Sequence, residues 1–290
     1  AGAAAVWTTT TTTTLGGTPS AAASTGVPRS VEQAVVDARG EVVGSAQRLT
    51  GAGPPGLEYP RREISADVFA DRAEWPATPP FTKDDFRRLD ESDDALFYPA
   101  AAPKLVYHVD EAAVAALTRY YEASVAPGSD VLDICSSWVS HYPAAFPDSM
   151  RSIVGVGINE NELRNNMQLT SFVATDLNKT PVLSFPDDSV DVVTCVVSVD
   201  YLTSPIEVLR EARRVLRKRP TSKIIISQSN RLFFTKAVRM WLGMSDLDHL
   251  ELIGKYLKYA GFEGAPKAYD ITATGGRGAR DPMFIVECAP

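Results

Sequence analysis

From about residue 105 onward, short apolar runs alternate with longer amphipathic segments. Apolar runs rich in β-branched residues predict buried strands at 131–135, 152–156, 172–176, 190–197 and 224–227. Apolar residues spaced three or four apart predict helices at 110–125, 206–217 and 245–260. Two late stretches, 265–272 and 282–288, predict an antiparallel pair. Strands that alternate with helices indicate βαβ units. We therefore expect an α/β fold with a seven-stranded, mostly parallel sheet, an antiparallel last strand and helices on both faces.

The N-terminal part of the chain has a different texture. Residues 1–30 are of low complexity, with a threonine run at 8–14, and predict a disordered leader. This leader has the composition of an organelle transit remnant, and a plain disordered leader is the alternative. Residues 31–50 predict an amphipathic helix, and 61–104, which mix charges, aromatics and prolines, predict an arm wrapped over another surface. The expected organisation is a leader at 1–30, a helix and arm at 31–104, and a main domain at 105–290.

Composition and charge narrow the function classes. The chain has 44% apolar and 22% charged residues, which is ordinary for a globular protein. The net charge of −7 argues against general nucleic-acid binding, which needs a basic face. No apolar run approaches the roughly 18–20 residues that cross a bilayer, so we expect no transmembrane segment. Three cysteines and three histidines, widely spaced, predict neither a disulfide framework nor a metal site.

Polar side chains recur where the predicted strands end. Asp133, Asn159, Asp176 and Ser198 follow four successive strands. In an open α/β sheet, ligands bind outside the carboxyl ends of the strands. The pattern therefore predicts a site for a nucleoside-like ligand at this edge.

Four segments in this region resemble one enzyme superfamily. Residues 130–143 look like the first motif of class I S-adenosylmethionine-dependent methyltransferases, and the later motifs resemble residues 185–193, 197–202 and 206–216. The set is most similar to the type 11 methyltransferase-like proteins of plants and green algae. The resemblance implies a Rossmann-like fold, S-adenosylmethionine as cofactor and, together with the leader, an organellar location, in a chloroplast rather than a mitochondrion.

The resemblance implies roles for residues of the first two strand ends. Asp133 would support the first loop, and Ser136 and Ser137 would contact the methionine part of the cofactor. Asn159 would contact the ribose. Structural alternatives stay open for each: a loop cap for Asp133, and helix N-caps for the two serines and for Asn159.

The resemblance also implies roles for residues at the next two strand ends. At two positions, however, the chain departs from the usual sequence pattern of the family. Asp176 and Leu177 would hold the adenine, and Ser198 would line the floor near the methyl group; a loop cap is the alternative for Asp176. Family members usually carry glycines after strand one, where this chain has residues 135–138 without glycine. They also usually carry an acid near the position of Asn159.

Candidates for acceptor chemistry lie on the predicted loops. Asp200, Tyr201, His141 and His249 are possible general bases, although a lone histidine is more often structural. The aromatic residues proposed to wall an acceptor pocket, or alternatively to pack, are Trp138, Tyr142, Phe233 and Trp241. The basic residues proposed to meet an acidic partner or an anionic acceptor, or alternatively to form a solvated face, are Arg231, Lys236 and Arg239.

Two hypotheses from different classes remain. The first is a methyltransferase that acts on a small-molecule acceptor in an organelle. The second is a catalytically silent methyltransferase fold that serves as a binding or assembly subunit, with a protein partner held by the N-terminal arm. A nicotinamide-dependent oxidoreductase is disfavoured because no glycine-rich dinucleotide fingerprint follows a strand.

Overall fold

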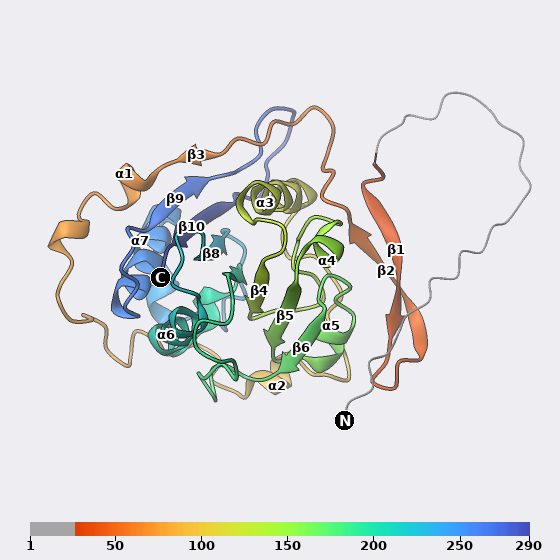
Figure 1. Ribbon diagram of the computed structural model, residues 1–290, viewed down its shortest axis with the longest axis horizontal. Helices are drawn as coiled ribbons and strands as arrows, with labels where there is room; N and C mark the ends of the chain where they lie inside the picture. Colours follow the sequence, from red (N-terminus) through yellow and green to blue (C-terminus); the bar gives the residue numbers. More distant parts are fainter. Residues whose placement is uncertain (1–26) are drawn as a thin grey trace, which may run out of the picture.

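A mixed β-sheet with helices on both faces forms the centre of the molecule (Figure 1). The structure, a computed structural model, describes residues 27–290. Its parallel strands are β4 (Asp130–Ile134), β5 (Ser152–Gly157), β6 (Ser171–Ala174), β7 (Val192–Val196) and β8 (Lys223–Gln228). The predicted α/β fold is therefore confirmed.

The late strand pair completes one side of this sheet. β10 (Phe284–Cys288) lies antiparallel between β8 and β9 (Lys267–Asp270). Within residues 27–290 the sheet has eight strands rather than the seven predicted, in the order β3-β9-β10-β8-β7-β4-β5-β6. The extra strand is β3 (Arg62–Glu63), a two-residue edge strand that pairs with β9.

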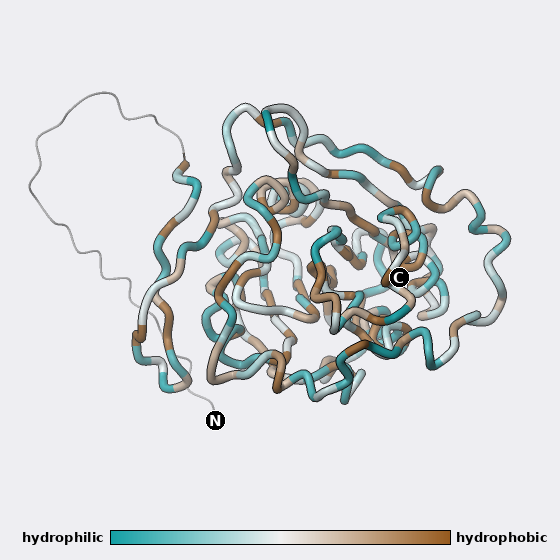
Figure 2. The backbone as a smooth tube through the Cα atoms, turned by 180° about the vertical axis from the view of Figure 1, so that it is seen from behind, coloured by the Kyte–Doolittle hydropathy of each residue, from teal (hydrophilic) through white to brown (hydrophobic). Residues whose placement is uncertain are grey.

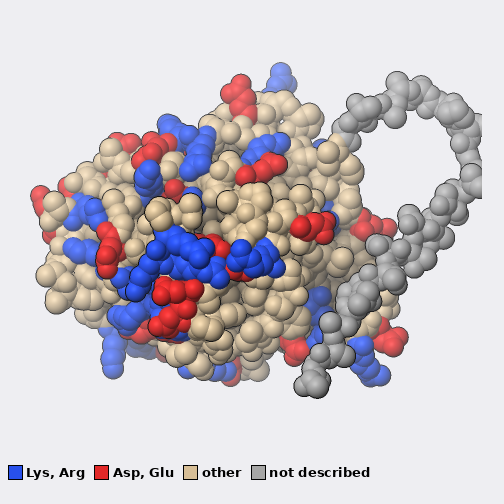
Figure 3. Space-filling view, viewed as in Figure 1, with Lys and Arg blue, Asp and Glu red and all other residues tan. Residues whose placement is uncertain are grey.

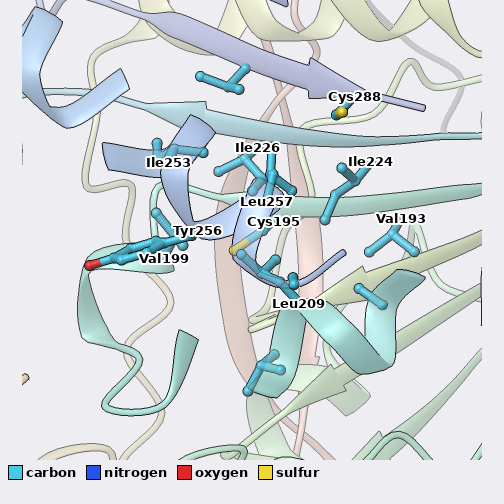
Figure 4. Close-up of a cluster of buried hydrophobic side chains, with 14 of the residues drawn as sticks. Val193, Cys195, Val199, Leu209, Ile224, Ile226, Ile253, Tyr256, Leu257 and Cys288 are labelled. Carbon is cyan, nitrogen blue, oxygen red and sulfur yellow. The ribbon is translucent and has the colours of Figure 1, made fainter. Parts of the chain in front are cut away.

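Alternation along the strands sends side chains to two separate cores. Ile224 and Ile226 of β8 pack on one face with α6 (Pro205–Val215) and α7 (Asp246–Tyr259). Figure 4 shows this cluster, with Leu209 and Ile253 supplied by the two helices. Ile225 points to the opposite face and joins the core under α3 (Glu111–Ser124). The period of two in the strands therefore produces both cores.

The remaining helices are short. They are α1 (Ser65–Val68), η1 (Arg72–Glu74), α2 (Asp94–Phe97), α4 (Phe146–Ser149), α5 (Glu160–Arg164), η2 (Val199–Tyr201) and η3 (Arg239–Trp241). Residues 135–145 after β4 form a loop without a helix. The suggestion that Ser136 and Ser137 cap a following helix is therefore wrong.

A β-hairpin replaces the helix predicted at 31–50, so that prediction is wrong. β1 (Ser30–Val36) and β2 (Val42–Leu49) pair antiparallel. Gly40 has a φ of 82° in the turn, a conformation that favours glycine and ends a helix. Flanking valines are β-branched and fit a strand better than a helix. The periodicity of apolar residues was too weak to overrule these local preferences.

The segment 61–104 runs along the outside of the main domain (Figure 1). Its side chains Ile64, Val68, Phe69 and Trp75 are buried in the core that contains α6 and α7. The Trp75 Nε1–H donates to Glu251 of α7 at 3.0 Å. This segment, called the arm below, thus shares a core with the domain that it covers.

The predicted leader at 1–30 lies, up to residue 26, outside the described residues. Residues 27–29 belong to no helix or strand.

None of the helices between residues 27 and 290 has the length and apolar character needed to cross a membrane. Apolar stretches gather towards the centre of the chain trace and the outer loops are more hydrophilic (Figure 2). On the face seen in Figure 3, basic and acidic side chains are interspersed.

Candidate functional site

A cavity of about 700 Å³ lies at the carboxyl ends of the parallel strands. Its walls come from the segments after β4, β5, β6, β7 and β8, and from the end of the arm through residue 109. The predicted site residues that line it are Asp133, Ser136, Ser137, Asp176, Leu177, Ser198, Tyr201 and His141. Asn159, Asp200 and His249 are not among the lining residues. The parallel topology therefore brings most of the predicted site together.

Asp133 ties the first loop to the sheet. Its carboxylate accepts hydrogen bonds from the hydroxyls of Ser136 (2.7 Å), Ser140 (2.6 Å) and Thr194 (2.8 Å). Burial raises the pKa of Asp133 to about 6, and the three hydroxyl donors oppose that rise. Since Thr194 is on β7, this one side chain joins the loop after β4 to two strands.

The carboxyl end of β5 carries no side chain at all. A Cβ on Gly157 would lie 2.0 Å from the carbonyl oxygen of Ser136, so only glycine fits there. The Ser136 N–H also donates to the Val156 carbonyl at 2.8 Å, which fixes the loop in this position. The first loop therefore occupies the space next to the strand end.

Glu162 supplies the carboxylate on this side of the cavity, and the sequence analysis missed it. It is 6% exposed and accepts from the Ser137 hydroxyl at 2.7 Å and from the Lys104 N–H at 2.9 Å. Its position three residues after Asn159, in the first turn of α5, was the available signal.

Asn159 itself caps α5. Its Oδ1 accepts from the N–H groups of Asn161 and Glu162, both at 3.1 Å, and its amide donates to the Glu162 side chain at 3.1 Å. This arrangement is the N-cap alternative. Asn159 therefore contacts the cavity lining through Glu162 and through the Tyr98 carbonyl, to which its amide donates at 3.5 Å.

Two further strand ends close the floor. The Asp176 Oδ1 accepts from the Asn178 N–H at 2.9 Å, while its Oδ2 lies 3.7 Å from the Lys179 ammonium. Leu177 is buried beside it. The Ser198 hydroxyl donates to the Val196 carbonyl at 2.7 Å. Asp176 thus retains an oxygen without a close hydrogen bond among the described residues.

The candidate bases fall into two groups. Tyr201 lines the cavity, and its hydroxyl accepts from the Phe233 N–H at 2.8 Å. Asp200 is buried away from the cavity, and burial raises its pKa to about 8, so it is protonated at neutral pH. His249 stacks on Trp241 at 4.1 Å, and its Nε2 lies 2.9 Å from the Trp241 carbonyl. Asp200 and His249 are therefore structural in this arrangement.

Of the three predicted bases with an imidazole or a carboxylate, only His141 lines the cavity. Its Nδ1 is buried and has no hydrogen-bond partner within residues 27–290. Burial and the nearby His108 lower the pKa of His141 to about 4, so the ring is neutral at pH 7. His108 also lines the cavity and was not singled out from the sequence.

Backbone strain concentrates at the same place. Four non-glycine residues of the described chain have positive φ, and three of them line the cavity: Cys135 (56°), His141 (60°) and Val197 (43°). Such a conformation is costly, most of all for a β-branched residue. Strained residues of this kind cluster at functional sites.

Of the four aromatic candidates, two line the cavity and two do not. Trp138 and Phe233 line the cavity, whereas Tyr142 and Trp241 do not. The indole N–H of Trp138 donates to the Val106 carbonyl at 3.1 Å.

The three basic residues have separate environments. Arg231 lines the cavity, and Arg239 pairs with Asp84 at the surface. Lys236 is fully buried against Asp90 and Asp94 of the arm, each at 3.2 Å. A solvated basic face is therefore wrong for Lys236.

One family model matches the centre of the chain. Residues 132–221 match a family model described as a methyltransferase domain. None of the curated proteins matches the sequence significantly.

Solved structures with a related fold are distant. YcgJ from Bacillus subtilis is 20% identical over 39% of this chain and 50% of its own length, with a TM-score of 0.33. This chain therefore spans only half of YcgJ. A SAM-dependent methyltransferase from Archaeoglobus fulgidus is 16% identical over 60% of this chain and 92% of its own, with a TM-score of 0.45.

A SAM-dependent methyltransferase from Aquifex aeolicus is 15% identical over 72% of this chain and 98% of its own, with a TM-score of 0.41. Likenesses this distant identify no substrate. The match to the methyltransferase domain model, over residues 132–221, includes β5, β6 and β7 and most of the residues that line the cavity.

Proposed function

We propose that this protein binds S-adenosylmethionine in the cavity and transfers its methyl group to a small acceptor. The observation that carries the proposal is the position and lining of the cavity. It lies over the carboxyl ends of the parallel strands, and most of its lining residues belong to the segment that matches the methyltransferase domain model. Asp133, Glu162 and Asp176 all face it.

The residues present suit the parts of this cofactor. Asp176 has an oxygen available for the adenine amino group, and Leu177 offers an apolar surface to the ring. Glu162, rather than Asn159, is the group that faces a ribose on the β5 side. Ser136 and Ser137 lie where the methionine part would be held. A cavity of about 700 Å³ also leaves room for an acceptor.

When bound, the cofactor supplies an electrophilic methyl group on a positively charged sulfur. The chain's own task is to orient the acceptor towards that methyl carbon and to exclude water. His141 lines the cavity and its ring is neutral, so it is the candidate to take a proton from an acceptor that carries one. Tyr201, whose hydroxyl accepts from Phe233, keeps its own proton free to donate.

A second candidate is a catalytically silent fold that binds a protein partner. Its support is that three of the four carboxylates that line the cavity, Asp94 among them, are already engaged by the chain itself. Asp133 accepts three hydroxyls, and Glu162 accepts Ser137, Lys104 and Asn159. The Ser136 carbonyl also fills the space beside Gly157. A ligand would then compete with bonds that are already made.

Calorimetric titration with S-adenosylmethionine and S-adenosylhomocysteine separates the two candidates. We expect binding, and we expect Asp176→Ala to weaken it by about 1–3 kcal/mol, the cost of a lost buried hydrogen-bond partner. Asp71→Ala, an exposed arm residue away from the cavity, is the matched control and should leave affinity unchanged. A folded wild-type protein that binds neither compound at millimolar concentration would favour the silent fold.

A further inference from the structure

One side of the cavity is built from aromatic rings around Phe233. Phe97 and Tyr98 of the arm lie 5.2 and 6.0 Å from its ring centre, and His108 lies 5.0 Å away. Tyr201 lies 5.8 Å away on the floor. We call the lining residues Tyr98, His108, Tyr201 and Phe233, together with Phe97, which contacts them without lining the cavity, the aromatic wall. Such a wall suits an apolar or aromatic ligand.

Two cations at this wall lack close carboxylates. The Lys104 ammonium lies 4.0 Å from the centre of the Phe97 ring, and no carboxylate approaches it within 4.0 Å in residues 27–290. Residues 1–26 contain no Asp or Glu. Arg231 is 59% exposed, and its nearest carboxylate oxygen, on Asp281, is 3.7 Å away. Both charges are thus positioned at the cavity and weakly paired.

Three of the four acids that line the cavity, by contrast, are already neutralised or hydrogen-bonded, and the fourth, Asp176, is assigned to the adenine by the proposed function. Asp94 lies 2.9 Å from Arg88 and 3.2 Å from Lys236. Asp133 and Glu162 are engaged as described above. The unsatisfied charge that faces an incoming acceptor is therefore positive.

The rim next to these cations is apolar. Val106 is 55% exposed and Phe234 is 60% exposed, and both line the cavity. Water-exposed apolar side chains beside weakly paired cations match a ligand that has an apolar body and an anionic group.

Building on the proposed methyl transfer, we propose that the acceptor is an amphipathic anion. Its apolar or aromatic body packs on the aromatic wall and Trp138, and its carboxylate, or a group of like charge, pairs with Lys104 and Arg231. The acceptor nucleophile then faces the floor at Ser198, where the methyl group is expected. This assigns the acceptor half of the cavity to residues of the arm and of the segment after β8.

Three probes of one shape test the proposal: 4-phenylbutyrate, its neutral amide and 4-phenylbutylamine. Each is titrated by calorimetry into the full chain, with and without S-adenosylhomocysteine. We expect the carboxylate to bind about 10-fold or more tightly than the amide, since a charge-assisted pair contributes about 1.5–3 kcal/mol. We expect the amine to bind weakest.

Single variants locate the site. Lys104→Met and Arg231→Gln should each lower affinity for 4-phenylbutyrate about 10-fold and leave affinity for the amide unchanged. The matched controls are Lys218→Met and Arg277→Gln, which are exposed and away from the cavity. Equal affinity for the carboxylate and the amide, or full affinity in Lys104→Met, would overturn the proposal.

The cofactor titration distinguishes this failure from failure of the proposed function. If S-adenosylhomocysteine binds and 4-phenylbutyrate shows no preference over its amide, the acceptor class is wrong and the methyltransferase proposal stands. If the carboxylate binds through Lys104 and Arg231 while neither cofactor form binds, the anion site stands and methyl transfer is wrong.

Discussion

The arm and the β1–β2 hairpin both precede the segment that matches the methyltransferase domain model, yet they are attached in opposite ways. The arm buries Trp75 and Phe69 in the main core, and its Asp94 meets the fully buried Lys236. The hairpin buries Gln33, and its valines at 42 and 43 are 69% and 63% exposed. Hydrogen bonds to Asn165 hold it to the domain. Apolar burial makes one extension part of the domain, whereas a few polar bonds leave the other peripheral.

The two extensions also differ in whether they contribute residues to the cavity. Asp94, Tyr98, Lys104 and His108 line the cavity and come from the arm or the segment directly after it. No residue of the hairpin lines it. We therefore expect loss of the arm's anchors to damage fold and site together, and loss of the hairpin's anchor to spare both.

The largest effect should come from Trp75→Ala. The change removes a side chain that is 6% exposed and its bond to Glu251, so we expect about 3–5 kcal/mol of destabilisation by urea unfolding. Val42→Ala on the hairpin is the matched control and should change stability by less than about 0.5 kcal/mol. Similar losses in the two variants would contradict the comparison.

The next effect is a pH dependence that reports how well the arm seals Asp200. Arg88 of the arm forms an isolated β-bridge with Val238. The Val238 N–H in turn donates to the backbone carbonyl of Asp200. The folded pKa of Asp200, about 8, exceeds an unfolded value of about 3.9. The native state therefore binds more protons between these values, and stability falls as pH rises through this range.

Asp200→Asn removes this titration. Between about pH 5 and pH 7 the wild-type protein should lose about 2 kcal/mol more unfolding free energy than the variant. Urea unfolding at both pH values measures the difference, and the other titrating groups cancel because the two proteins share them. Parallel pH profiles would mean that water reaches Asp200 and that the arm does not seal it.

The smallest effect is expected for the anchor of the hairpin. Asn165→Ala removes the side-chain bonds to the Val36 N–H (2.8 Å) and carbonyl (2.9 Å), so we expect a loss of about 1 kcal/mol in local stability. Hydrogen exchange should quicken in β1 and β2, with the amides of β4 and β7 unchanged. Faster exchange throughout the sheet would show that the hairpin is integral, like the arm.

Much of the fold follows from local sequence pattern. Buried parallel strands are short, continuous apolar runs, and the runs that became β4, β5, β7 and β8 stand out for that reason. The α6 and α7 helices likewise show in the spacing of their apolar residues. The hairpin did not, because five valines and two glycines can be arranged on a helix or on a strand, and the turn at Gly40 decided between them.

The position of the candidate site could be predicted from the sequence more completely than the residues that line it. The sequence places Asp133, Asp176 and Ser198 at strand ends, and parallel strands end at one edge of a sheet, so their convergence follows from topology. Glu162, Lys104 and His108 enter the cavity from separate segments. Their membership depends on how α5 and the arm pack, which no local pattern records.

The sequence by itself thus determined the sheet, its helices and the edge at which the cavity lies, because each depends on residues close together in the chain. Only the tertiary structure decided that Gly157 faces the Ser136 carbonyl, that Lys236 is buried under the arm, and that the Lys104 ammonium lies over the Phe97 ring. Those outcomes depend on contacts between distant segments, where burial and charge pairing are settled only when the whole chain packs.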